Sequence, residues 1–269
     1  MDLPRDVVEH ILYFLCEDKR TLKVVSLTCR ALFSAARRLI HRKIELATWK
    51  VYSPSKLADR VAVKVLPARK VREAHMQYLS VAGGRGLLGY TRELIIAIGP
   101  SFSPETLETC LHQFRSFEQV QILRIHQFDL ASFLPHFERY FTQFVPTLRS
   151  LHLPDVVGSD REVLEFICKF PRLDDLSLKL SSACSTDDPP RPSMEPSPPL
   201  RGKLILRGWG FPPSRFLLEI PGGLHFRSID VGKVGKANLD EVLVACSSTL
   251  EEFSFSPTSS ELTHTISCC

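Results

Sequence analysis

The sequence lacks the short motifs by which many metal proteins and hydrolases are recognised. It holds eight cysteines and nine histidines but no CxxC, CxxH, HExxH or GxSxG pattern. Such patterns bring metal ligands together or place a nucleophilic serine on a sharp turn. We therefore expect no metal site, no cofactor and no catalytic residue. The enzymatic alternative is a triad assembled across the fold, which a sequence alone does not exclude.

Long uncharged stretches are missing as well. No apolar run approaches the roughly 18 residues of a membrane-spanning helix, and the N-terminal MDLPRDVVEH has acids where a signal peptide carries a basic patch. The cysteines are scattered, most of them in apolar segments where a reduced cysteine packs as a small hydrophobe. With 44% hydrophobic and 24% charged residues, the chain has the composition of a folded, water-soluble protein. We expect reduced cysteines and a cytoplasmic or nuclear location.

Charge is unevenly distributed along the chain. The net charge is +4, yet residues 1–72 carry 16 Lys and Arg against 7 Asp and Glu, which leaves 18 against 23 in the remainder. A basic segment of this kind can meet an acidic protein, a nucleic acid or a membrane surface, or it can be a solvated helical face. The asymmetry indicates two functional parts.

The first forty residues have the periodicity of helices. Apolar residues recur at helical spacing in 3–15, with Asp2 as expected N-cap and Pro4 in the first turn, and again in 21–40, where we expect two helices and a bend near 28–30. About forty residues are too few to bury this much apolar surface among themselves. Either the rest of the chain or another subunit must cover the excess.

The apolar positions of this segment resemble an F-box over residues 3 to about 44. The resemblance implies three helices that bind the SKP adaptor of an SCF-type cullin-RING ubiquitin ligase and, through it, the cullin. Phe33 stands where an F-box usually has another aromatic residue, often Trp. By this resemblance, the positions that contact the adaptor or form its framework are Leu3, Pro4, Ile11, Leu15, Leu22, Val25 and Leu32.

Two other interpretations of these helices stay open. The segment can be an ordinary helical cap of the larger domain. It can also be a helix-turn-helix with Arg37, Arg38, Arg42 and Lys43 on phosphates, but the stretch from Ala31 to Ala36 offers few polar side chains to read bases. We expect neither nucleic acid nor membrane as a partner.

A repeated unit of the form apolar-x-x-apolar-x-apolar follows from residue 91. Its central positions are 94, 123, 151, 176, 204, 229 and 253, at intervals of 29, 28, 25, 28, 25 and 24 residues. This is the period of leucine-rich repeats, in which a short strand and a helix alternate. Helix signals lie between the strands, among them Ser159 with Glu162 and Asn238 with Glu241, which have the spacing of capping boxes.

The repeats resemble the irregular leucine-rich arrays of fungal F-box proteins. The chain has one asparagine, Asn238, and the position where the regular repeat has its closing asparagine holds residues such as Phe128, Val156 and Val234. The fold class we expect is α/β: an N-terminal three-helix F-box (1–46), a connecting segment (47–90) and an irregular leucine-rich-repeat solenoid (91–269), with a curved parallel sheet and outer helices.

Two segments break the repeat. Residues 181–199 contain six prolines and five serines and predict an extended loop, with Ser197-Pro198 as a possible phosphorylation site. After the strand near 253 no helix signal follows, so we expect an exposed sheet edge there. The terminal pair Cys268-Cys269 resembles a prenylation signal, and the sequence leaves open whether these cysteines are modified.

One strand face of the repeats provides a candidate target-binding row. Between the apolar positions of each strand, the intervening side chains project to the open side of the sheet. The expected row is Arg124, His152, Ser177, Ile205, Asp230 and Ser254, flanked by His126, Lys179 and Arg207. Its mixed charges favour a polar protein surface as target. The predicted function is therefore a non-catalytic substrate receptor of a ubiquitin ligase, and the alternative is a non-degradative leucine-rich-repeat interaction scaffold.

Overall fold

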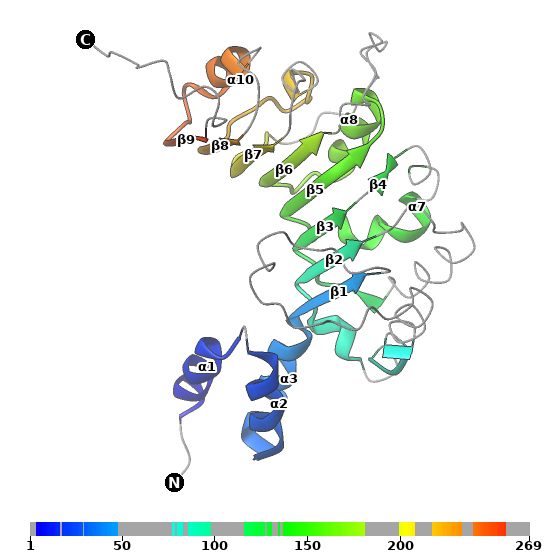
Figure 1. Ribbon diagram of the computed structural model, residues 1–269, viewed down its shortest axis with the longest axis vertical. Coiled ribbons are helices and arrows are strands. Elements are labelled where there is room, and N and C mark those ends of the chain that lie inside the picture. The colour runs from blue at the N-terminus through cyan, green and yellow to red at the C-terminus, as the bar shows by residue number, and fades with distance from the viewer. Residues whose placement is uncertain are drawn as a thin grey trace, which may run out of the picture. The chain divides into compact units, whose positions relative to one another are not determined.

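The protein is described here by a computed structural model, in which the chain divides into two compact units, residues 1–121 and 122–269 (Figure 1). The residues that the structure describes are 4–16, 18–28, 30–47, 77–78, 80–82, 86–97, 116–126, 128–130, 134, 137–180, 199–207, 217–232 and 239–256.

The first unit contains three helices followed by a pair of parallel strands. The helices are α1 (Arg5–Phe14), α2 (Lys19–Thr28) and α3 (Arg30–Arg42), and the strands are β1 (Lys43–Ala47) and β2 (Glu93–Ala97), with the short 3-10 helix η2 (Leu87–Tyr90) before β2. Ile44 of β1 lies opposite Leu94 of β2. The break between α2 and α3 falls within the range where the sequence predicts a bend. Strand β1 was not predicted.

The start of α1 differs from the prediction. The N-cap is Pro4, in an extended conformation with ψ 144°, and no side chain caps the helix. The prediction of Asp2 as N-cap is therefore wrong: proline stands just outside the helix rather than in its first turn, which its fixed φ and missing N–H permit. By contrast, α2 has a side-chain cap, since Asp18 Oδ1 accepts the N–H groups of Arg20 at 3.0 Å and Thr21 at 3.1 Å.

The second unit is a parallel sheet with helices between its strands. Its strands lie in chain order, with β4 beside β5 off the main path (Figure 1). The elements are β3 (Ile122–His126), β4 (Phe128–Asp129), α7 (Phe137–Tyr140), η5 (Thr142–Phe144), β5 (Ser150–Val157), α8 (Asp160–Cys168), β6 (Asp175–Leu180), β7 (Lys203–Arg207), β8 (Ser228–Gly232), α10 (Leu239–Cys246) and β9 (Glu252–Ser256).

A backbone hydrogen bond joins the beginnings of neighbouring strands in both units. In the first unit Arg92 N–H donates to Arg42 O at 2.8 Å, and Gln121 N–H donates to Arg92 O at 2.8 Å. In the second unit the same bond links the corresponding residues of successive repeats, at 2.8 to 3.0 Å: Asp174 to Arg149, Gly202 to Asp174, Arg227 to Gly202 and Glu251 to Arg227. This bond holds the register of each strand against the preceding one.

A group of phenylalanines forms the core between α7, η5 and α8. Phe137, Phe141, Phe144, Phe166 and Phe170 are all buried. Their rings meet edge-on or stacked at centroid distances between 5.4 and 6.1 Å. Aromatic pairs at these separations stabilise a core beyond their buried area.

Most of the predicted repeat elements are present. The α/β class with a parallel sheet is confirmed, and each of the seven predicted central positions lies on a strand. The capping box at Ser159 is also confirmed: the Ser159 side chain accepts the Glu162 N–H, and the Glu162 carboxylate accepts the Ser159 N–H at 2.7 Å. Asn238 and nearly all of the loop 181–199 lie outside the described residues. No helix in the described part of the chain is both long and apolar enough to cross a lipid bilayer.

Candidate interaction surfaces

The helices α1 to α3 share a small core. Four side chains are buried in it, those of Val8, Leu12, Leu22 and Ala36. Partly buried side chains pack around these four, namely Leu15, Val25, Leu32, Ala35, Leu39 and Ile40. The three helices thus pack on a small apolar core, and further apolar side chains of the same helices lie outside it.

Those further residues are exposed, and we call them the helix surface: Val7, Ile11 and Phe14 on α1, Val24 and Leu27 on α2, and Phe33 on α3. Their spacing of three or four residues places those of α1 on one helical face, and likewise those of α2. The exposed fraction is 47% for Ile11, 75% for Phe14 and 82% for Leu27. The Arg37 guanidinium lies over the Phe33 ring at 4.3 Å.

The predicted adaptor-binding residues fall into two groups. Pro4 and Ile11 are exposed, so another protein can reach them. Leu15, Val25 and Leu32 are partly buried against the core of the helices. Leu22 has no exposed surface, so its role is to hold the helices together, and it cannot itself touch a partner in this conformation. Leu3 lies outside the described residues. Phe14, Val24 and Leu27 are exposed positions that the prediction omitted.

On the second unit, the six residues predicted to form a row do lie side by side. The strand register places Arg124 opposite His152, and then in turn Ser177, Ile205, Asp230 and Ser254, one on each successive strand. We call these six residues the open-face row. Their neighbours along each inner strand are buried, such as Leu176 and Leu178 beside Ser177. Alternate burial is the mark of a sheet with one covered and one open face.

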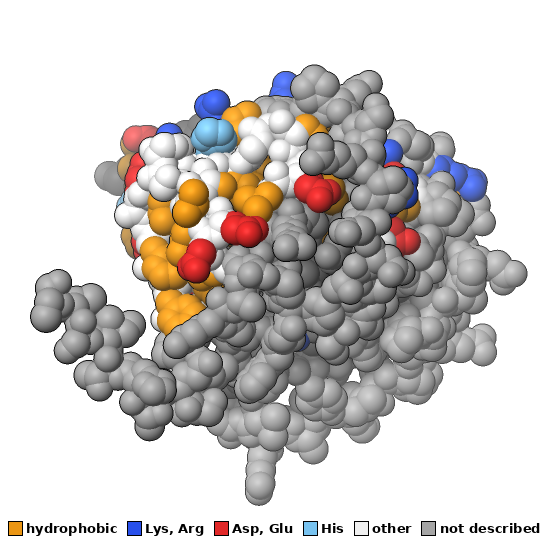
Figure 2. Space-filling model, turned by 90° about the horizontal axis from the view of Figure 1, so that it is seen from above, with side chains coloured by type: hydrophobic (Ala, Val, Ile, Leu, Met, Phe, Trp, Pro, Cys, Tyr) orange, Lys and Arg blue, Asp and Glu red, His pale blue; other side chains and the backbone are white. Residues whose placement is uncertain are grey.

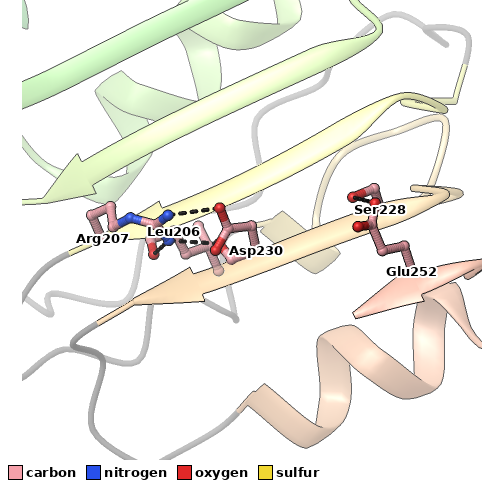
Figure 3. Close-up of polar contacts among 5 residues, drawn as sticks. All are labelled: Leu206, Arg207, Ser228, Asp230 and Glu252. Atoms are coloured by element: carbon pink, nitrogen blue, oxygen red, sulfur yellow. Dashed lines mark hydrogen bonds and ion pairs between the residues drawn. The ribbon is translucent and has the colours of Figure 1, made fainter. Parts of the chain in front are cut away.

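Two members of the predicted surface bind each other. Arg207 on β7 and Asp230 on β8 form an ion pair, with Nη2 and Oδ2 2.7 Å apart (Figure 3). Arg207 Nη1 also donates to the carbonyl oxygens of Asp230 at 3.1 Å and Leu206 at 3.2 Å. The hydrogen bond from Arg207 holds the pKa of the Asp230 carboxyl below its usual range. A target that engaged either charge would have to compete with this pair.

Gly232 explains how Arg207 reaches across the sheet. A Cβ built at Gly232 would lie 3.0 to 3.1 Å from the Arg207 side chain. The missing side chain therefore leaves the space that the guanidinium stem occupies. This contact could not be read from the sequence, because it depends on which way the arginine side chain turns.

Polar pairs also link the beginnings of the strands. Arg149 Nη1 lies 3.3 Å from Asp174 Oδ2, Asp175 Oδ1 accepts the Lys203 N–H at 2.8 Å, and Ser228 Oγ donates to Glu252 Oε2 at 3.0 Å (Figure 3). These contacts join one strand to the next, as the backbone hydrogen bonds do. These contacts stabilise the sheet, and they do not involve the side chains of the open-face row other than through the strands that carry them.

Titratable groups elsewhere in the described residues point to packing rather than chemistry. Burial raises the pKa of the Cys168 thiol to about 11 and also raises the pKa of Cys246. Both are free thiols, as is Cys16, and a protonated buried thiol is a poor nucleophile. In the described ranges, no three His, Cys, Asp or Glu side chains are placed to hold a metal ion together.

No protein-family model matches the chain, and no curated protein is significantly similar to it.

Proposed function

We propose that this protein is a substrate receptor of an SCF-type cullin-RING ubiquitin ligase. In this proposal α1 to α3 act as an F-box that docks on the SKP adaptor, and the second unit is an irregular leucine-rich solenoid that binds a target protein. The observation that carries the proposal is the helix surface: three short helices with a four-residue core expose six large apolar side chains. A surface of this kind is typical of a site that another protein covers.

The size of the apolar term is compatible with specific binding. Fully burying one such side chain contributes about 1.5–3 kcal/mol. Because these side chains are already partly covered, each would contribute about 1 kcal/mol or more to the binding free energy before the costs of association are subtracted. Association costs consume several kcal/mol, on the order of 4–15. Apolar burial alone therefore supports weak binding, and polar contacts from neighbouring side chains must contribute the rest.

The proposed target arm is the open-face row. Because Arg207 and Asp230 bind each other, the other polar members of the open-face row, Arg124, His152, Ser177 and Ser254, are the proposed target contacts. His152 Nε2 also lies 3.0 Å from Ser150 Oγ, so a target would compete with that contact. In this proposal no residue of the chain makes or breaks a bond. The protein instead increases the rate of ubiquitin transfer by holding a target lysine close to the ubiquitin-loaded enzyme. We propose that it acts in the cytoplasm or nucleus.

The test is binding of the purified 269-residue chain to a recombinant SKP adaptor, alone and with cullin, measured by calorimetry. We expect binding of the parent chain and an affinity weaker by about fivefold or more for Ile11→Ala and for Phe14→Ala, the factor that about 1 kcal/mol gives. The matched control is Val244→Ala, since Val244 is an equally apolar, exposed residue in the other unit and should bind the adaptor as the parent does.

Each other outcome has a defined meaning. No binding of the parent chain, or equal binding by all three variants, would overturn the proposal. Adaptor binding that excludes the cullin would favour the non-degradative scaffold. Salt-dependent binding to DNA or to anionic vesicles, without adaptor binding, would favour the nucleic-acid or membrane alternative.

A further inference from the structure

Strand β9 exposes residues that occupy core positions in the strands before it. Phe253 and Phe255 are 46% and 43% exposed, while Ile229 and Val231, their register partners on β8, are completely buried. In the described part of the chain, β9 pairs with β8 alone. Figure 2 looks onto this end of the second unit and shows hydrophobic side chains gathered there with acidic side chains beside them.

The sequence of β9 is nearly symmetrical about its centre. It reads Glu-Phe-Ser-Phe-Ser, so Ser254 has a phenylalanine on either side. If two such strands pair antiparallel with Ser254 opposite Ser254, then Phe253 of one copy lies opposite Phe255 of the other, on the same face of the sheet. Cross-strand aromatic pairs of this kind stabilise antiparallel sheets. Glu252 would lie opposite Ser256, a hydroxyl group rather than a second carboxylate.

Charge also selects this arrangement. In the antiparallel pair the two Glu252 residues stand at opposite ends of the interface, about 14 Å apart at about 3.4 Å per residue, which exceeds the screening length of roughly 8 Å at physiological salt. A parallel in-register pair would place them in adjacent strands about 4.8 Å apart. Only the antiparallel arrangement has a two-fold axis, which closes the assembly at two copies.

We propose that a second copy of this chain docks on β9, antiparallel and centred on Ser254, so that the two sheets become continuous and Phe253 and Phe255 of both copies are covered. This inference does not rest on the proposed ligase function, because it is argued from the pairing edge of β9 alone, although Ser254 also belongs to the open-face row. The contact is small: about 45% of a phenylalanine that can bury 150–250 Å² gives roughly 150–200 Å² for the two rings of one copy. A stable dimer usually buries more than about 1,200 Å² in total. The dimer is therefore weak and forms at high protein concentration rather than at nanomolar concentration.

The first experiment measures the average mass of the purified 269-residue chain by sedimentation, at protein concentrations from about 5 to about 200 µM, a range that suits a weak dimer. The average mass should rise towards twice that of one chain. The variant Phe255→Lys should stay monomeric over the whole range. The matched control is Val81→Lys, because Val81 is exposed to a similar extent, 48%, in the first unit and should dimerise like the parent. A chain that is monomeric at every concentration, or a Phe255→Lys variant that dimerises like the parent, would overturn the proposal.

A second experiment tests the register and does not depend on whether Phe255→Lys folds. Under mild oxidation, Ser254→Cys should give a crosslinked dimer well above the background of the parent chain, because the two side chains face each other about 5 Å apart. Glu252→Cys is the matched control and should stay at background, since its two copies lie too far apart for a disulfide. Equal crosslinking by both variants, or by neither, would refute the antiparallel register. Pairing of β9 with a different partner would appear as a chain that stays monomeric alone.

Discussion

The buried phenylalanine cluster provides the sharpest test of how the second unit is held together. Phe166 of α8 is fully buried, and its ring lies 5.7 Å from that of Phe137, 6.1 Å from Phe141 and 5.4 Å from Phe170. Its burial contributes about 1.5–3 kcal/mol, each aromatic neighbour adds about 0.5–1.5 kcal/mol, and truncation also leaves a cavity. We therefore expect Phe166→Ala to lower the free energy of unfolding of this unit by about 3–5 kcal/mol.

The assay is native-state amide hydrogen exchange of β5 and β6, which reports this unit separately from the first, together with urea unfolding followed by circular dichroism. Phe166→Leu keeps most of the apolar volume but loses the three ring contacts, so it should cost about 1.5–3 kcal/mol, less than the alanine variant. Val244→Ala removes an exposed side chain from α10 and should stay within about 0.5 kcal/mol of the parent. A loss below about 1 kcal/mol for Phe166→Ala, or equal losses for the alanine and leucine variants, would refute the packing argument.

Two further predictions concern a close backbone contact and a buried histidine. Gly202→Ala should lower the free energy of unfolding, measured with urea, by about 1–3 kcal/mol, because the new Cβ would lie 2.8 Å from the Asp174 carbonyl oxygen. Gly89→Ala adds a Cβ in open space and should leave the stability unchanged. Equal effects of the two changes would argue against the contact. Burial, and then the charges of Arg37, Lys19 and Lys23, lower the pKa of His41 below its ordinary value of 6.5. As pH falls below 6.5 the unfolded chain takes up the proton before the folded one, so the first unit should lose stability on acidification. Thermal melting from pH 7.5 to 5.5 should show a steeper loss for the parent than for His41→Gln, and parallel curves would contradict this.

The strands of the repeat could be predicted because each carries its own pattern. In Leu151-His152-Leu153 or Leu204-Ile205-Leu206, two apolar residues flank one that faces the other way, and the pattern returns at a constant period. Alternation of this kind survives irregular loop lengths, since it depends on the strand alone. The open-face row followed from the same alternation, and the register confirms that its members are neighbours.

Strand β1 and the phenylalanine cluster could not be predicted in the same way. Ile44 and Leu46 continue directly from the long helical pattern of α3, so two apolar residues at a spacing of two gave too little signal to mark a change of period. In the segment around α7, Phe137, Phe141 and Phe144 recur at helical spacing, but the chain forms only a four-residue helix and a short 3-10 helix there, so the spacing alone does not mark them as one core cluster. Their role depends on α8, which packs against them from a later position in the chain.

The polar contacts of the candidate surfaces could not be predicted from the sequence, because they depend on side-chain rotamers and on how the elements pack. Arg207 and Asp230 were both predicted to face a target, and the prediction that they share a face is confirmed. Their mutual ion pair depends on the arginine rotamer and on the space at Gly232. The exposure of Phe14 and Leu27 likewise depends on how the three helices pack, which the apolar pattern alone left undetermined.

The hydrogen bonds at the beginnings of the strands have a consequence for how such a chain can vary. Successive repeats differ in length, from 24 to 29 residues between equivalent positions, yet each strand starts level with the one before it. Insertions are therefore absorbed downstream of the strand, in the connecting segments, and do not displace the next strand along its neighbour. Loop length and the composition of the open face can consequently diverge independently of each other, and single exchanges along the sheet can change the open face without relocating any strand.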